Sequence, residues 1–121
     1  MPRLVRPPSS VLLVVGREDF TPPRAFGGSV CVATQDCVAI AVVDVQVSAT
    51  SLRLTPDDAP ALSRLGEFRI ETEGLVSVRD LHYREHESVG VPSGWATVTV
   101  WGNAEDQPSE IALQVVAGPG D

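Results

Sequence analysis

Short apolar runs rich in valine, interrupted about every ten residues by Gly, Pro or Asp, constrain the fold of this chain most. The chain holds 19 valines among 121 residues, and β-branched residues favour extended, pleated backbone. Short strands at regular spacing are typical of a sandwich or a barrel. We therefore expect an all-β fold: an antiparallel β-sandwich, or a small partly open barrel, of eight to ten strands.

The expected strands and their limits follow from the same punctuation. They cover residues 10–15, 29–33, 37–48, 52–54, 67–73, 75–80, 81–87, 89–91, 95–101 and 109–116. One short helix is expected near 56–65, because Thr55 or Asp58 can cap it and Gly66 can end it. We expect a flexible N-terminal arm over 1–9, a single β domain over 10–116 and a flexible tail over 117–121.

The composition narrows the class of protein. All nine basic residues are arginine, which excludes lysine chemistry; the set fits either anion recognition or a high-GC bacterial coding bias. The longest aliphatic run near the start, 11–15, is far shorter than the ~20 residues of a membrane span. The N-terminus does not read as a signal peptide. Without a serine elbow, phosphate loop or paired Cys motif, we expect a cytoplasmic protein that is not an enzyme and needs no cofactor.

The net charge of −7 is unevenly placed. Residues 1–60 hold five arginines and six acids, whereas 61–121 hold four arginines and ten acids. An acidic domain repels nucleic acid and anionic membranes and attracts basic partners. The same charge also serves simple solubility. We expect a basic protein partner, and neither nucleic acid nor membrane binding.

Two segments carry cysteine and histidine. Cys31 and Cys37 flank a turn centred on Thr34, which leaves open a cross-strand disulfide or two buried free thiols. His82 and His86 are the candidate metal ligands, and a third ligand is missing from their face. This segment and the Pro-x-Gly turn at 92–94 resemble the metal motifs of cupins, and that resemblance implies a small metal- or ligand-binding barrel.

Two strand patterns indicate a binding surface. On 67–73, Phe68, Ile70 and Thr72 are expected to face inward, while the outward positions are Glu67, Arg69, Glu71 and Glu73. Since the chain turns back at 73–74, Glu85 and Glu87 are expected to extend this face into one acidic patch. The strand 95–101 carries Trp95 and Trp101 on one face and valines on the other, and either face can be the core.

The order of features after Phe68 resembles that of bacterial competence nuclease inhibitors and small immunity-type β proteins. The residues that carry it are the alternating strand and turn of Phe68–Leu75, then Ser88–Trp95 leading into Thr97–Trp101. The resemblance implies a non-enzymatic acidic β protein that occludes a toxin or nuclease.

The leading hypothesis is therefore an immunity- or inhibitor-type protein that covers a basic partner with an acidic sheet face. The partner-binding residues it uses are Glu67, Arg69, Glu71, Glu73, Glu85, Glu87, Trp95 and Trp101. The alternatives are a structural or assembly subunit that forms homo-oligomers through sheet edges, or the cupin-like barrel.

Overall fold

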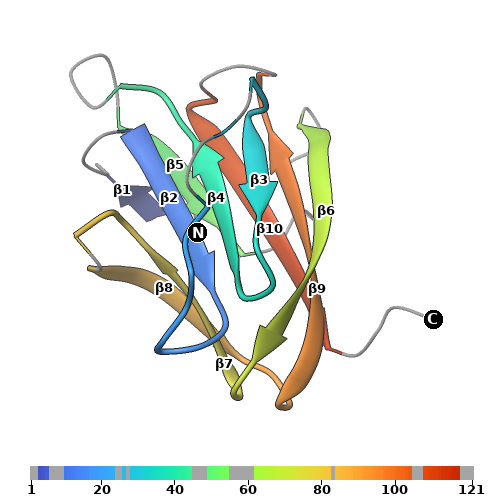
Figure 1. The fold of residues 1–121 in the computed structure, drawn as a ribbon. Helices are drawn as coiled ribbons and strands as arrows, with labels where there is room; N and C mark the ends of the chain where they lie inside the picture. The colour runs from blue at the N-terminus through green and yellow to red at the C-terminus, as the bar shows by residue number, and fades with distance from the viewer. Residues whose placement is uncertain are drawn as a thin grey trace.

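Two five-stranded sheets pack face to face in the computed structural model (Figure 1). The structure describes residues 3–5, 10–23, 26, 28–44, 49–54, 62–82, 84–104 and 108–117. Its strands are β1 (Arg3–Val5), β2 (Val11–Val15), β3 (Cys31–Ala33), β4 (Cys37–Ala41), β5 (Thr50–Arg53), β6 (Ser63–Thr72), β7 (Leu75–Arg79), β8 (Glu85–Gly90), β9 (Gly94–Gly102) and β10 (Glu110–Ala117). The expected all-β sandwich is confirmed.

The strand order fixes which surfaces are available. Sheet A has the order β1-β5-β10-β9-β6, and sheet B has the order β3-β4-β2-β7-β8. Neighbours are antiparallel except β5 and β10, which run parallel. β6 and β8 therefore lie at the edges of different sheets, on opposite sides of the view in Figure 1.

The core lies between the two sheets and follows the alternation of each strand. Sheet A contributes fully buried Ile70, Val98, Val100, Ile111 and Leu113, and sheet B contributes Leu12, Val14, Val38, Ile40, Val76 and Val78. Burying an aliphatic side chain of this size contributes about 1.5–3 kcal/mol. The inward positions expected for Ile70 and Thr72 are confirmed, since both are buried.

The prediction of a short helix near 56–65 is wrong for residues 63–65. Residues 55–61 lie outside the described residues, but Ser63 begins β6 and pairs with Gly102 of β9. Gly66 lies at a register shift in β6 and does not end a helix. Pairing with β9 along the whole strand outweighs the local helix-capping signals.

The long strand expected over 37–48 ends at Ala41. Beyond it the backbone N–H of Val42 donates to Ser10 and that of Val43 to Pro108, at 2.9 and 3.0 Å. Val42 is thus hydrogen-bonded to the residue before β2, whereas Val43 is hydrogen-bonded to the segment that precedes β10 of sheet A. Residues 45–48 lie outside the described residues.

The two sheets are joined by backbone hydrogen bonds at one end. The N–H of Glu73 donates to the carbonyl of Gly16 at 2.8 Å, and the N–H of Glu71 donates to Gln35 at 2.8 Å. A Cβ at Gly16 would lie 2.1 Å from the carbonyl oxygen of Glu71, so only glycine fits there. Gly74, with φ 117°, then turns the chain from β6 of sheet A into β7 of sheet B.

Part of the expected N-terminal arm belongs to the sandwich. Residues 3–5 form β1, which pairs with β5, and Val5 is buried in the core.

Within the described ranges, no helix is long and apolar enough to cross a membrane.

Candidate functional site

The outer face of sheet A carries both tryptophans. Ala96, Val98 and Val100 are fully buried, so the valine side of β9 faces the core and the tryptophan side faces outward. Trp95 is 42% exposed and Trp101 is half-buried. We call this surface the tryptophan face: Glu67, Arg69 and Glu71 of β6, Trp95, Thr97, Thr99 and Trp101 of β9, and Gln114 and Val116 of β10.

Strand register brings side chains from all three strands together on this face. Arg69 and Val116 both lie opposite Thr97, while Glu67 and Gln114 both lie opposite Thr99. These residues and Phe68 line an open groove of about 530 Å³. The sequence singled out the β6 positions and the face of β9 with both tryptophans, but it missed Gln114 and Val116, because only the register of β9 and β10 reveals them.

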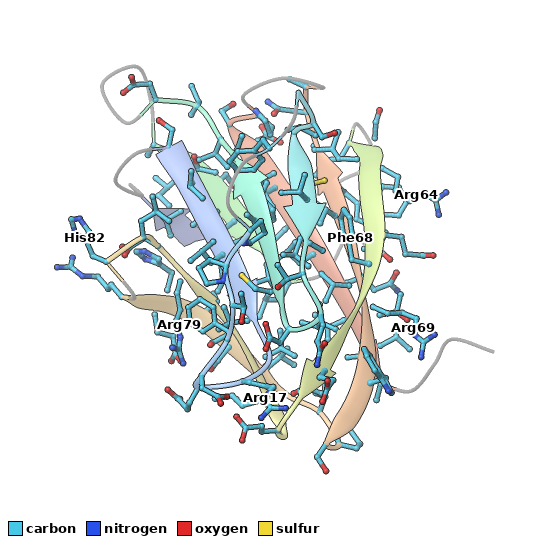
Figure 2. All side chains as sticks on the ribbon, in the orientation of Figure 1. Arg17, Arg64, Phe68, Arg69, Arg79 and His82 are labelled. Atoms are coloured by element: carbon cyan, nitrogen blue, oxygen red, sulfur yellow. The ribbon has the colours of Figure 1, made fainter. Side chains whose placement is uncertain are left out.

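The polar groups of the tryptophan face hold one another in place. The guanidinium of Arg69 lies 5.0 Å from the centre of the Trp95 ring, a cation–π contact. The hydroxyl of Thr99 donates to Glu67 at 3.3 Å, and Arg64 lies 3.8 Å from the same carboxylate. Figure 2 shows Arg64 and Arg69 both projecting outward from β6. The face is therefore of mixed charge, with an exposed aromatic ring at one end.

Glu71 and Glu73 take part in a charged corner where the two sheets meet. Glu71 accepts from Arg17 at 3.2 Å and from the side-chain amide of Gln35, and Glu73 accepts from the backbone N–H of Glu18 at 2.9 Å. Both carboxylates thus hold the chain together at this corner.

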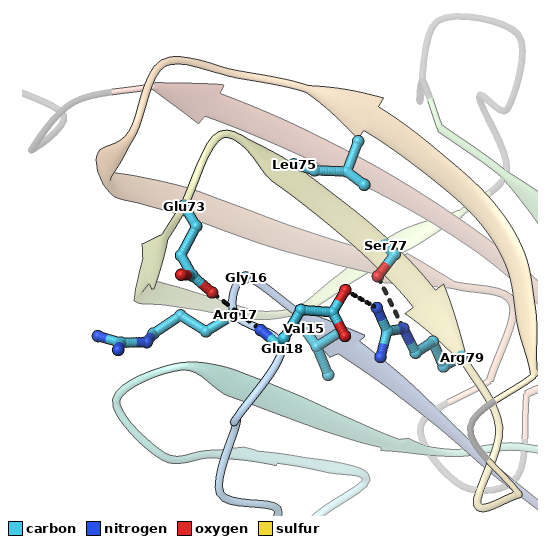
Figure 3. A pocket seen from close by; sticks show the side chains of 8 residues that line it. All are labelled: Val15, Gly16, Arg17, Glu18, Glu73, Leu75, Ser77 and Arg79. Atoms are coloured by element: carbon cyan, nitrogen blue, oxygen red, sulfur yellow. Dashed lines mark hydrogen bonds and ion pairs between the residues drawn. The ribbon is translucent and has the colours of Figure 1, made fainter.

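A small pocket of about 70 Å³ lies inside the charged corner (Figure 3). Arg79 donates there to Glu18 at 3.2 Å and to the buried hydroxyl of Ser77 at 3.0 Å. Arg17 also lines the pocket, and Figure 3 shows its guanidinium directed away from these groups. Arg79 and Glu18 form an ion pair within the pocket, and the pocket volume suits only a very few water molecules.

Glu85 and Glu87 do not join the acidic residues of β6. They lie on β8, the outer strand of sheet B, whereas Glu67 and Glu71 lie on the edge strand of sheet A. A register shift between Val78 and Arg79 places Glu87 opposite Val78 and Glu85 opposite Arg79. The two glutamates therefore do not share one regular strand face, and the single acidic patch expected from the sequence does not form.

The side chains of His82 and His86 have different surroundings. His86 Nε2 lies 3.0 Å from Asp80 Oδ2, and the other carboxylate oxygen accepts from the backbone N–H groups of His82 and Arg84. Burial would raise the pKa of Asp80, but the hydrogen bonds from His86 and from these two backbone groups lower it. The His82 side chain is exposed on the side of the molecule away from Arg69 (Figure 2).

The metal candidates lack a complete ligand set in the described structure. No group of three or more His, Cys, Asp or Glu side chains that could hold a metal ion occurs in these ranges. The ring of His86 is instead hydrogen-bonded to Asp80. The Asp80 carboxylate also accepts from the backbone N–H of His82 and so holds the turn between β7 and β8.

The two cysteines are free and buried. In the hairpin, Cys31 lies opposite Ile40, so the expected centre at Thr34, which would have put Cys31 opposite Cys37, was wrong. Cys31 belongs to the core between the sheets, while Cys37 packs in a cluster on the outer face of sheet B. Burial raises the pKa of Cys31, and burial together with the charge of Asp36 raises the pKa of Cys37 to about 12.

Two aromatic side chains cover part of the outer face of sheet B. Phe20 and Phe26, from the loop after β2, pack against Leu13, Val15 and Ala39. A continuous apolar run such as 11–15 is typical of a strand buried on both faces, so the sequence did hold this signal. Phe20 and Phe26 therefore cover this part of sheet B.

Comparisons with known proteins found no matching family model, curated protein or solved structure.

Proposed function

We propose that this chain is a non-enzymatic binding protein whose tryptophan face docks a basic protein partner. The observation that carries the proposal is the exposure of two large apolar side chains at the open groove of sheet A. Trp95 is 42% exposed, and Val116, which lines the groove, is 48% exposed.

The exposed side chains of the tryptophan face are of the kinds found at protein–protein interfaces. Exposed aromatic rings flanked by aliphatic and hydroxyl groups are typical of interface centres, where Trp is enriched among the residues that dominate affinity. Trp95 is held by Arg69, so its ring is pre-organised and loses little side-chain entropy on binding. Trp95 is the proposed anchor, and Thr97 and Val116 surround the contact.

The charge of the chain supports a basic partner through steering. The net charge is −7, and long-range attraction raises association rates with oppositely charged proteins. Glu67, whose side chain is 53% exposed, is the carboxylate of the tryptophan face best placed to meet a partner's cation. Glu71 and Glu73 are engaged at the charged corner, so their role is to hold the chain there. Occlusion of a basic toxin or nuclease, as the sequence resemblance implies, is the specific form of this proposal.

The test compares variants of the tryptophan face with a matched surface control. Trp95→Ala should weaken binding of a partner captured from the host at least about 30-fold, as expected of an aromatic anchor. Glu67→Arg should slow association at low salt and flatten its salt dependence. Surface plasmon resonance measures both effects.

The control is Leu75→Ala, because Leu75 is a comparably exposed hydrophobic residue, at 45%, on sheet B. It should leave affinity unchanged. Circular dichroism establishes that each variant stays folded. Equal affinity of wild type and Trp95→Ala, or capture of an acidic partner alone, would contradict the proposal.

Assembly through sheet edges is the second candidate, and the position of β8 favours it. β8 (Glu85–Gly90) ends sheet B, so one side of its backbone lacks a partner strand among the described residues. Such an edge can pair with a second copy. Light scattering that shows only monomers over a wide concentration range would remove this candidate.

A further inference from the structure

An apolar pocket lies on the outer face of sheet B, apart from the tryptophan face. Its floor comes from three neighbouring strands: Val32 of β3, Ala39 of β4, and Val11 and Leu13 of β2. Val32 and Leu13 lie on either side of Ala39 in one row across the sheet. A small residue between two larger ones leaves a hollow there.

The loop after β2 supplies the other wall of the pocket through Pro22, Pro23 and Phe26. Proline has no backbone N–H, so Pro22 and Pro23 bring no unpaired donor to the pocket, and their fixed φ angles stiffen the wall. The backbone next to them is also fixed, because the N–H of Thr21 donates to Asp36 at 2.9 Å and its carbonyl accepts from Thr34 at 2.5 Å. The pocket is therefore formed before any ligand arrives.

The size and chemistry of the pocket select its ligand. Its volume is about 160 Å³, close to the ~150 Å³ of an apolar protein cavity that stays dry and binds benzene. The described lining residues carry neither charge nor a side-chain hydrogen-bonding group. Leu81, 40% exposed, stands at the pocket and leaves an apolar side chain at the surface.

From these observations we infer that the pocket is a binding site for a small molecule that inserts one uncharged aromatic ring. The ring removes the apolar lining from water and gains dispersion contacts with it. A polar substituent on the ligand points to solvent, since the pocket is open on one side. This pocket lies on the opposite sheet from Trp95. The test of ligand binding here is therefore independent of the test of partner binding at the tryptophan face.

The experiment titrates benzyl alcohol into the full chain and follows its methyl resonances by NMR. The methyl groups of Val11, Leu13, Val32 and Leu81 should shift saturably, with a dissociation constant on the order of 1 mM for so small a ligand. Those of Leu75 and Val116, which lie outside the pocket, should not shift.

Ala39→Phe fills the hollow and should weaken binding at least about tenfold, whereas Ala117→Phe, the same change at an exposed position of sheet A, should leave it unchanged. If Ala39→Phe does not fold, the same binding measurement is made on Ala39→Leu, which should also weaken binding. Shifts that stay linear up to the highest concentration, or an affinity that is unaltered in the folded Ala39 variant, would overturn the inference.

Discussion

At the scale of single residues, the tightest constraints lie where the two sheets meet. Gly16 approaches the backbone of Glu71 so closely that no side chain fits, and its carbonyl accepts the hydrogen bond from Glu73. In the sequence this residue is merely the glycine after an apolar run, a stop signal for a strand. Its second role, allowing sheet A to contact sheet B, depends on a residue 55 positions later and is invisible locally.

Gly16→Ala should therefore destabilise the protein by about 3 kcal/mol, because the new Cβ forces the two backbones apart. Gly90→Ala is the matched control: a Cβ there has only the carbonyl oxygen of Gly74 within range, at 4.0 Å, so the change should stay within about 0.5 kcal/mol. Urea unfolding of both variants measures the difference. A loss below about 1 kcal/mol for Gly16→Ala would show that the corner can relax.

At the scale of secondary-structure elements, the β7–β8 connection depends on one buried carboxylate. Asp80 accepts from the backbone of His82 and Arg84 and from the ring of His86, which ties the turn to β8. The sequence grouped the two histidines as metal candidates, because their alternation puts them on one strand face. The register shift at Arg79 and the contact with Asp80 give His86 a structural partner.

Asp80→Ala should cost about 2–4 kcal/mol at neutral pH, because it leaves three donors without their acceptor. Asp80→Asn should cost less, since its amide oxygen still accepts from the backbone. The pKa of Asp80 is lowered in the fold, so its stabilising effect is present above its ordinary value near 3.8 and is lost as pH falls through the folded value.

Urea midpoints at pH 7 and at pH 2–3 check both parts of the Asp80 prediction. The gap between wild type and Asp80→Ala should shrink in acid. A gap that is the same at both pH values would assign the effect to packing alone.

At the scale of the whole molecule, the sandwich keeps two thiols out of water in separate layers. Cys31 lies between the sheets, and Cys37 packs in the cluster with Phe20 and Phe26 on the outer face of sheet B. Burial disfavours the thiolate form of both, so the pKa of each thiol is raised in the fold. The thiols therefore set an alkaline limit on stability for the fold as a whole.

Stability should fall as pH rises from about 9 towards 12, the pKa of Cys37 in the fold. The unfolded chain releases the thiol proton near pH 9 and the folded one does not, so unfolding is favoured by up to about 1.4 kcal/mol per pH unit. Cys37→Val should flatten this slope, while its stability at pH 7 should change little. Thermal unfolding in the presence of a reductant, at pH 7 to 10.5, measures both. An unchanged alkaline slope in Cys37→Val would contradict the prediction.

The sequence by itself determined the fold class, most of the strands and most of the inward positions. It missed β1, and it divided β8 into two strands over 81–87 and 89–91. Alternation along residues 67–73 sufficed to place Ile70 and Thr72 in the core, because side-chain direction in a strand has a period of two and burial of apolar groups dominates folding. The apolar run at 11–15 likewise predicted a strand, and β2 lies there. These properties are encoded within a few neighbouring residues.

Only the tertiary structure decided which faces are open and which charges meet. The β9 strand has two faces of comparable hydrophobicity, and its valine side is buried because it packs against sheet B while the tryptophan side has no layer over it in the described structure. Glu85 and Glu87 were expected beside β6, but the turn at Gly74 leads into the other sheet. Strand pairing joins residues far apart in the chain, and its register is set by the packing of the whole core, so no local pattern could reveal it.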